Sequence, residues 1–247
     1  MRRGFAVSLL WALTLGCASS GAWKYEPISQ QLAPHPLAAS RVAVLPFEDR
    51  RPQGNSDKKL LYLIPLVPWG SFEYNQIEAG SGFLTHAAYQ IRPSEDLAKA
   101  VVAELAKANL FREIFYTERE QEPDVDYFLK GGVDEFRYDG RLYSYGFSAY
   151  APYFWLFGLP AGRTRNSLDV SLELRRAGDG EVLWRSHPDR MERSLTSGLY
   201  YNWGKEFESY PQMMQQAARQ WVEELSSYVR QNPIAFEPAP TPSSSSP

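Results

Sequence analysis

The sequence predicts an α+β fold: a small, mostly antiparallel sheet with two amphipathic helices on one face, plus a long aromatic-rich insertion. Apolar and polar residues alternate strictly over 167–175, which is typical of a strand with one buried face, and 181–185 fits its hairpin partner. Residues 94–110 and 211–232 instead space their apolar residues three and four apart, which is typical of helices. Two helices packed on one face of the sheet would bury all these apolar side chains in one core.

Two further strands are expected earlier in the chain. The run 41–47 is almost entirely apolar, as in a strand that is covered on both faces. Residues 126–138 form the other strand, in which Gly131 and Gly132 mark a β-bulge.

The two helices carry recognisable start signals. Ser94 follows Pro93 and is expected to cap the first helix, whose first turn is acidic. The second helix begins near Pro211 and ends before Pro233. Its apolar face is expected to pack in the core and consists of Met214, Ala218, Trp221, Leu225 and Tyr228.

Composition and charge exclude several classes of function. Without residues 1–16, the chain has 24 basic and 29 acidic side chains, a net charge of −5. Nucleic-acid binding needs a basic surface, so no nucleic-acid partner is expected. Cys17 is the only cysteine, which excludes an intramolecular disulfide and a cysteine-based metal cluster. We expect neither a cofactor nor a metal ion.

Residues 1–16 are expected to be a signal peptide. Two arginines are followed by the uncharged stretch 5–15, which is shorter than the roughly 20 apolar residues of a membrane-spanning helix. The segment Leu13-Thr14-Leu15-Gly16-Cys17 then resembles the lipobox of bacterial lipoproteins, although that family prefers Leu at the position of Thr14.

This resemblance implies that the thiol of Cys17 receives a diacylglycerol, that the signal peptide is cleaved before it, and that its new amino group is acylated. Two or three acyl chains would anchor the chain stably. Ala18, where an Asp favours inner-membrane retention, implies an outer-membrane lipoprotein that faces the periplasm. The alternative is an ordinary secretory signal cut after Ala18 or Ser20, which would release a free periplasmic protein.

The mature chain is expected to have three parts: the lipidated cysteine and a tether over 17–40, a single α/β periplasmic domain over 41–236, and a disordered tail over 237–247. The element order and the run Val42-Ala43-Val44-Leu45-Pro46-Phe47 resemble small α/β periplasmic lipoproteins. These include the curli-secretion lipoprotein, activators of penicillin-binding proteins and auxiliary lipoproteins of transport systems. They share a core and differ in task, so the resemblance selects no function.

No residue pattern predicts a catalytic or metal site. His35 lies between two prolines of the tether, His86 precedes the first helix, and His187 has Asp189 two residues on. None of the three has the spacing of a metal ligand, and His187 with Asp189 is expected to be a solvated loop pair. We therefore expect no catalytic residue.

The most unusual feature is the uncharged stretch 142–162, in which 8 of the 15 residues from Tyr143 to Phe157 are aromatic. A second uncharged run covers 60–72. Three interpretations stay open: packing in the core, a surface for a partner or ligand, or a hairpin of two strands in lipid. The surface would consist of Tyr150, Tyr153, Phe154, Trp155 and Phe157.

We expect this stretch to contact protein rather than lipid, because Pro152 and Pro160 lack the backbone donor that a membrane-spanning structure uses. The expected function is a non-enzymatic, lipid-anchored periplasmic adaptor or assembly factor of a cell-envelope complex. It would contact the membrane through Cys17 and an envelope protein through its surface. A subunit of an oligomeric outer-membrane secretion pore and an envelope hydrolase are the alternatives, and the oligomeric state is left open.

Overall fold

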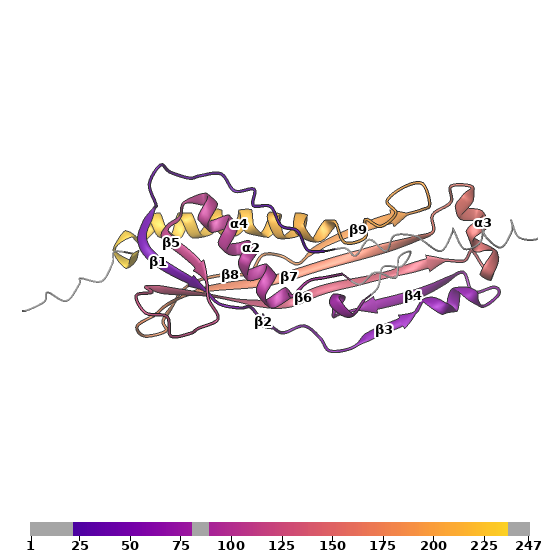
Figure 1. Ribbon diagram of the computed structural model, residues 1–247, viewed down its shortest axis with the longest axis horizontal. Helices are drawn as coiled ribbons and strands as arrows, with labels where there is room; N and C mark the ends of the chain where they lie inside the picture. The colour runs from indigo at the N-terminus through magenta and orange to yellow at the C-terminus, as the bar shows by residue number, and fades with distance from the viewer. Residues whose placement is uncertain (1–21, 81–88, 237–247) are drawn as a thin grey trace, which may run out of the picture.

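The computed structural model describes residues 22–80 and 89–236, and it confirms the α+β class (Figure 1). Within these residues, one open mixed sheet has nine strands. The strands are β1 (Ala38–Val44), β2 (Glu48–Asp49), β3 (Asn55–Lys58), β4 (Trp69–Tyr74), β5 (Phe111–Tyr116), β6 (Tyr127–Tyr143), β7 (Gly162–Arg176), β8 (Val182–Ser186) and β9 (Met191–Ser197). The helices are α2 (Pro93–Ala108), α3 (Ala151–Leu156) and α4 (Ser209–Gln231), with short 3₁₀ turns η1 (Lys59–Leu63), η2 (Ile77–Ala79), η3 (Ser148–Tyr150) and η4 (Pro233–Phe236).

The sheet is organised around one long antiparallel pair, β6 and β7. β1 pairs in parallel with the first part of β6 and with β5, whereas β4 pairs with the last part of β6. β8 and β9 pair with opposite ends of β7. The sheet is therefore larger than expected, and its parallel pairs place the apolar β1 between two neighbours, as an inner strand.

Both long helices cover the same face of the sheet, as predicted (Figure 1). The alternation over 167–175 is confirmed, because its apolar residues are buried and lie under α4. The predicted face of α4 is also buried, except that Tyr228 is only partly covered. No helix among the described residues is long and apolar enough to span a membrane.

Two local predictions were wrong. Ser94 makes no cap; instead the carboxylate of Asp96 accepts a hydrogen bond from the amide of Arg92 at 2.8 Å, one turn earlier. The β-bulge lies at Asp134, not at the two glycines. Gly131 instead allows the ring of Phe47 to approach the backbone of β6, since a Cβ at Gly131 would stand 2.5 Å from that ring.

Residues 22–37 pack as an extended strap along α2, which differs from the free tether expected over 17–40 (Figure 1). At one end of the strap the amide of Trp23 donates to the carbonyl of Gln90 at 3.0 Å. Near the other end, the amide of Leu32 donates to the last carbonyl of α2 at 3.0 Å. The strap then leads directly into β1.

One buried carboxylate holds the middle of the strap. Glu104 of α2 accepts hydrogen bonds from the Tyr25 hydroxyl at 2.6 Å and from the amides of Ile28 and Ser29 at 2.9 and 2.8 Å. Burial alone would raise the pKa of Glu104, but these hydrogen bonds outweigh it and lower the pKa below its ordinary value. The strap is thus tied to α2 by an ionised side chain.

Leu172→Asp tests the strand assignment. Leu172 is 3% exposed, so the substitution buries an unpaired charge and should cost about 3 kcal/mol or more of unfolding free energy in a urea titration. Glu173→Gln, next along β7 on the open face, is the control, since it removes only ion pairs with Arg175 and Arg185. Equal losses in both variants would contradict the assignment.

Glu104→Gln should loosen the strap. Amide exchange at Ile28 and Ser29 should become faster, because an amide cannot replace a carboxylate that accepts all three hydrogen bonds. Since the folded pKa of Glu104 is lowered, its stabilisation should be complete above the ordinary pKa of 4.5 and should be lost as the pH falls through the folded value. Glu95→Gln, at a partly exposed position in the first turn of the same helix, should leave this exchange unchanged. If it has the same effect, Glu104 does not hold the strap.

Candidate functional site

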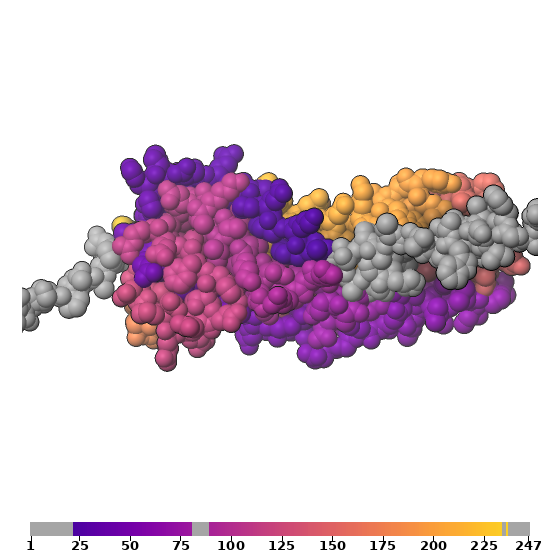
Figure 2. Space-filling model, viewed as in Figure 1, coloured from indigo at the N-terminus to yellow at the C-terminus, as the bar shows by residue number. Residues whose placement is uncertain are grey.

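Exposed apolar side chains gather at one end of the molecule, which we call the apolar tip. It consists of residues 60–69, 145–160 and 199–203, beyond the paired ends of β4, β6 and β7 (Figures 1 and 2). Among the described residues, every exposed large apolar side chain except Leu32 belongs to it. These side chains are Leu60, Leu61, Leu63, Ile64, Leu66, Trp69, Phe147, Tyr150, Tyr153, Leu156, Phe157, Leu159, Tyr200 and Trp203.

Backbone hydrogen bonds join the segments of the tip. The amide of Leu66 donates to the carbonyl of Gly146 at 2.9 Å, and the amide of Tyr145 donates to that of Pro68 at 3.0 Å. Gly146 has a positive φ of 83°, a conformation that suits a residue without a side chain. The hydroxyl of Tyr200 donates to the carbonyl of Leu156 at 2.9 Å. The two uncharged runs of the sequence thus form one structure.

The predicted surface residues divide into two groups. Tyr150, Tyr153 and Phe157 are exposed, as expected for a surface. Trp155 is only 8% exposed and donates to the carbonyl of Tyr143 at 3.2 Å, so for this side chain the core interpretation holds. Phe154 also turns inward and packs against neighbouring aromatic rings.

A hairpin of two strands over 142–162 is not what the structure shows. β6 ends at Tyr143, β7 begins at Gly162, and η3 and α3 lie between them. Tyr200 and Trp203 were missed, although Leu199-Tyr200-Tyr201-Asn202-Trp203 is rich in aromatic residues, because the sequence does not show that folding brings Tyr200 beside α3. The sequence did mark 60–72 through its lack of charge.

The other end of the sheet has the opposite chemistry. On the open face, a depression of about 1050 Å³ is lined mainly by charged side chains of both signs. Its lining includes Lys130 of β6, Glu173 and Arg175 of β7, and Arg185 of β8. Lys130 and Tyr143 lie near opposite ends of β6, so extended strand separates this charged depression from the tip by about 40 Å.

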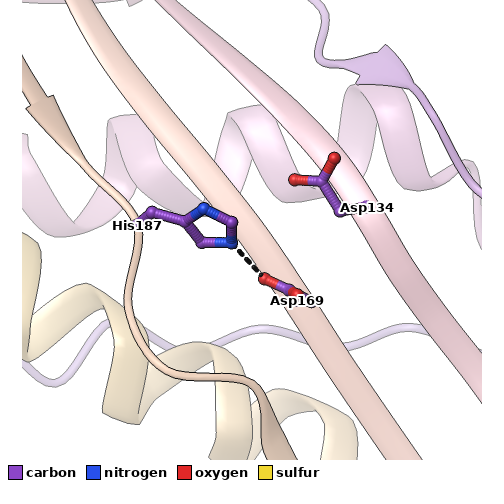
Figure 3. Close-up of side chains that lie close together, drawn as sticks. All are labelled: Asp134, Asp169 and His187. Atoms are coloured by element: carbon purple, nitrogen blue, oxygen red, sulfur yellow. Dashed lines mark hydrogen bonds and ion pairs between the residues drawn. The ribbon is translucent and has the colours of Figure 1, made fainter.

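A histidine and two carboxylates meet beside the depression (Figure 3). Nε2 of His187 lies 2.7 Å from Oδ1 of Asp169 on β7, and not beside Asp189 as the sequence suggested. Asp134, the bulge residue of β6, turns toward the same point, so that one ligand atom of each residue lies within 4.8 Å of the others. The donor types of this group, one imidazole and two carboxylates, suit a divalent cation.

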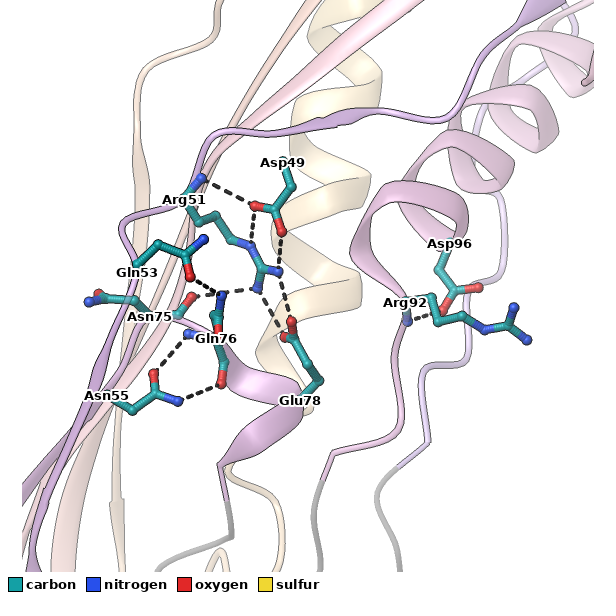
Figure 4. A network of polar contacts seen from close by, with 9 residues as sticks. All are labelled: Asp49, Arg51, Gln53, Asn55, Asn75, Gln76, Glu78, Arg92 and Asp96. Carbon is teal, nitrogen blue, oxygen red and sulfur yellow. Dashed lines mark hydrogen bonds and ion pairs between the residues drawn. The ribbon is translucent and has the colours of Figure 1, made fainter. Parts of the chain in front are cut away.

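A buried arginine fixes the segment that leads toward the tip (Figure 4). The Arg51 guanidinium donates to Asp49 and to Glu78 of η2, both at 2.8 Å. Its hydrogen bond to Asp49 is the main cause that lowers the pKa of that carboxyl. Close by, Asn55 accepts from the amide of Gln76 at 3.0 Å. The start of β3 is therefore held against the chain that follows β4.

Cys17, the predicted lipidation site, and His86 lie outside the described residues, as does the predicted tail 237–247. His35 lies in an exposed part of the strap, just before β1. His35 therefore takes part in none of the sites described above.

No protein-family model matches the chain, and no curated protein matches it. Among solved structures it is similar to a DUF330 protein from Xanthomonas campestris, with 13% identity, a TM-score of 0.49, and coverage of 86% of this chain and 99% of that one. It is also similar to CT253 from Chlamydia trachomatis (14% identity, TM-score 0.39, 79% and 100% covered). The lipoprotein GNA1162 from Neisseria meningitidis has 10% identity and a TM-score of 0.28 over 72% and 96% of the two chains. Similarities at this level assign neither a family nor a function.

Proposed function

We propose that this chain is a lipid-anchored, non-enzymatic adaptor of the bacterial cell envelope. In this proposal Cys17 holds the chain at the outer membrane, and the folded domain faces the periplasm. The charged depression receives a protein partner, and the apolar tip is a second docking surface. The domain would thereby connect a membrane with a soluble or membrane-bound component of an envelope complex.

The observation that carries the proposal is the opposite chemistry of the two ends of the sheet. The tip exposes large apolar side chains from three segments, whereas the depression presents charges of both signs. Soluble domains rarely expose a contiguous apolar surface of this kind unless it docks on something. Charged surfaces favour protein recognition by complementary charge. Two such surfaces on one rigid sheet suit a protein that brings two components together.

The anchor is supported by the sequence. A short apolar stretch, small Gly16 and the only cysteine of the chain follow one another in the order that a lipobox requires. The described domain begins five residues later, at Ala22. A lipid on Cys17 would therefore be followed at once by the strap.

Cys17→Ser should abolish lipidation and leave an unprocessed or a soluble exported protein. Membrane fractionation together with mass spectrometry of the amino terminus measures both outcomes. Ser20→Cys in the wild-type background is the matched control, because it adds a second thiol without removing the one that the lipobox needs. A correctly processed Cys17→Ser protein that still fractionates with membranes would contradict the anchor.

A photo-crosslinking residue at Arg185 should capture a protein in intact cells. Arg185 lines the depression and its side chain is 70% exposed, so the replacement should not disturb the fold. The same residue at Arg219, exposed on α4, is the control and should give no discrete adduct. Lys130→Glu should weaken the capture, because it reverses a charge of the depression. If position 185 captures no protein, or if Lys130→Glu changes nothing, the depression is not the partner surface.

A further inference from the structure

We propose that the apolar tip lies in the lipid–water interface of the same membrane that holds the lipid on Cys17. This inference rests on the proposed anchoring and goes beyond it by naming what the tip contacts. The domain would then touch the membrane at two points, the acylated cysteine and the tip. Such contact is shallow and does not require any segment to span the bilayer.

The chemistry of the tip fits an interface. Its two most exposed large apolar side chains are aliphatic or phenyl groups, Leu66 and Phe157, which are 89% and 83% exposed. Nearer the sheet lies Trp69, which is 41% exposed and has the Arg141 guanidinium 4.8 Å from its ring centroid. Tryptophan, tyrosine and arginine are favoured where acyl chains meet head groups, while aliphatic side chains are favoured deeper. The tip thus combines exposed aliphatic and phenyl groups with the tyrosine, tryptophan and arginine side chains that suit a bilayer surface.

Several backbone amides of the tip also meet the requirement that lipid imposes. Amides that enter an apolar phase need hydrogen-bond partners within the protein. The amide of Leu66 donates to Gly146, that of Phe157 donates to Phe154 at 3.1 Å, and that of Leu159 donates to Phe154 at 3.2 Å. The prolines that counted against a spanning structure bring no amide that needs a partner. They are therefore no obstacle to shallow insertion.

The segment between Cys17 and the strap is long enough for the lipid to reach the base of the tip along the direction of β6. The strap begins at Ala22, beside Gln90, and the neighbouring Tyr89 stacks on Phe207, which packs on Tyr138 of β6. From Tyr138 to the base of the tip at Tyr143, extended strand covers about 17 Å.

The chain from Cys17 to Ala22 is equally long in residues, so its greatest reach is also about 17 Å. Figure 1 shows that the strap runs along α2 from β1 in the direction of α3 and that its described part stops near the middle of the molecule. A lipidated Cys17 can therefore reach the level of the base of the tip, and it keeps the start of the strap within about 17 Å of the bilayer. A lipid surface is consequently close enough for the tip to contact it when the domain is oriented toward the membrane.

The test uses the lipidated mature chain in protein-free phosphatidylcholine vesicles. Because the lipid occupies Cys17, one introduced cysteine can be labelled with the polarity-sensitive fluorophore nitrobenzoxadiazole. Tyr153→Cys places the probe on the tip, where Tyr153 is exposed, and Gln121→Cys places it on an exposed loop beside the charged depression. We expect a several-fold rise in emission, a blue shift and quenching by spin-labelled lipids at position 153, with no change at position 121.

A double substitution, Leu66→Asp with Phe157→Asp, should abolish the rise at position 153 while the chain still floats with vesicles. Leu66 has a positive φ of 67°, a conformation that Asp adopts more easily than Leu, so the fold should persist. Gln212→Asp with Gln231→Asp adds the same charge on exposed positions of α4 and should leave the rise intact.

Three results would overturn the inference. If the chain floats with vesicles but position 153 behaves like position 121, the anchor holds and the tip does not contact lipid; a protein is then its occupant. Equal changes at both positions would mean that contact is not specific to the tip. If the chain does not float at all, the proposed anchoring and the inference both fail. Flotation therefore distinguishes failure of the anchor from failure of the tip alone.

Discussion

The antiparallel ladder between β6 and β7 is the interaction on which the rest of the structure depends. It runs from the pair Tyr127–Arg176 to the pair Leu142–Gly162, so it extends along almost the whole sheet. Every other strand except β3 and β5 pairs with one of these two. The helices in turn pack on the apolar face that the ladder aligns. Because its length fixes the distance between the two ends of the molecule, the same ladder separates the apolar tip from the charged depression.

The two faces of this ladder differ in the interactions that their side chains make. On the covered face, burial of apolar side chains under α2 and α4 provides the main stabilisation. On the open face, charged residues pair along and across strands, as in the contacts of Glu173 with Arg175 on the same strand and with Arg185 on β8. Exposed ion pairs of this type contribute little to stability, so the open face is free to vary without loss of the fold. A partner surface and the group formed by Asp134, Asp169 and His187 can therefore be accommodated there.

Sequence reasoning found the elements whose pattern is local and missed those that depend on distant neighbours. The alternation over 167–175 and the apolar face of α4 predicted strand and helix correctly, because burial repeats with the period of the element. β5 and β9 carry no such pattern, since their positions are set by pairing with β1 and β7. At the tip, the absence of charged residues identified 60–72 and 142–162 as unusual segments. It could not show that Trp155 turns inward while Phe157 turns outward, because that depends on how α3 meets the end of β6.

The strap over 22–37 is chain that would become part of the free tether if it were released from α2. While Glu104 and the bonds at both ends hold it, only the residues between Cys17 and Ala22 separate the folded domain from a lipid at Cys17. If the strap detached, the free chain between the lipid and the folded domain would lengthen by about 50 Å. A few hydrogen bonds on one face of α2 thus decide whether the domain rests at the membrane surface or ranges across the space beyond it. The strap, while bound to α2, thus limits the length of free chain between the lipid and the domain.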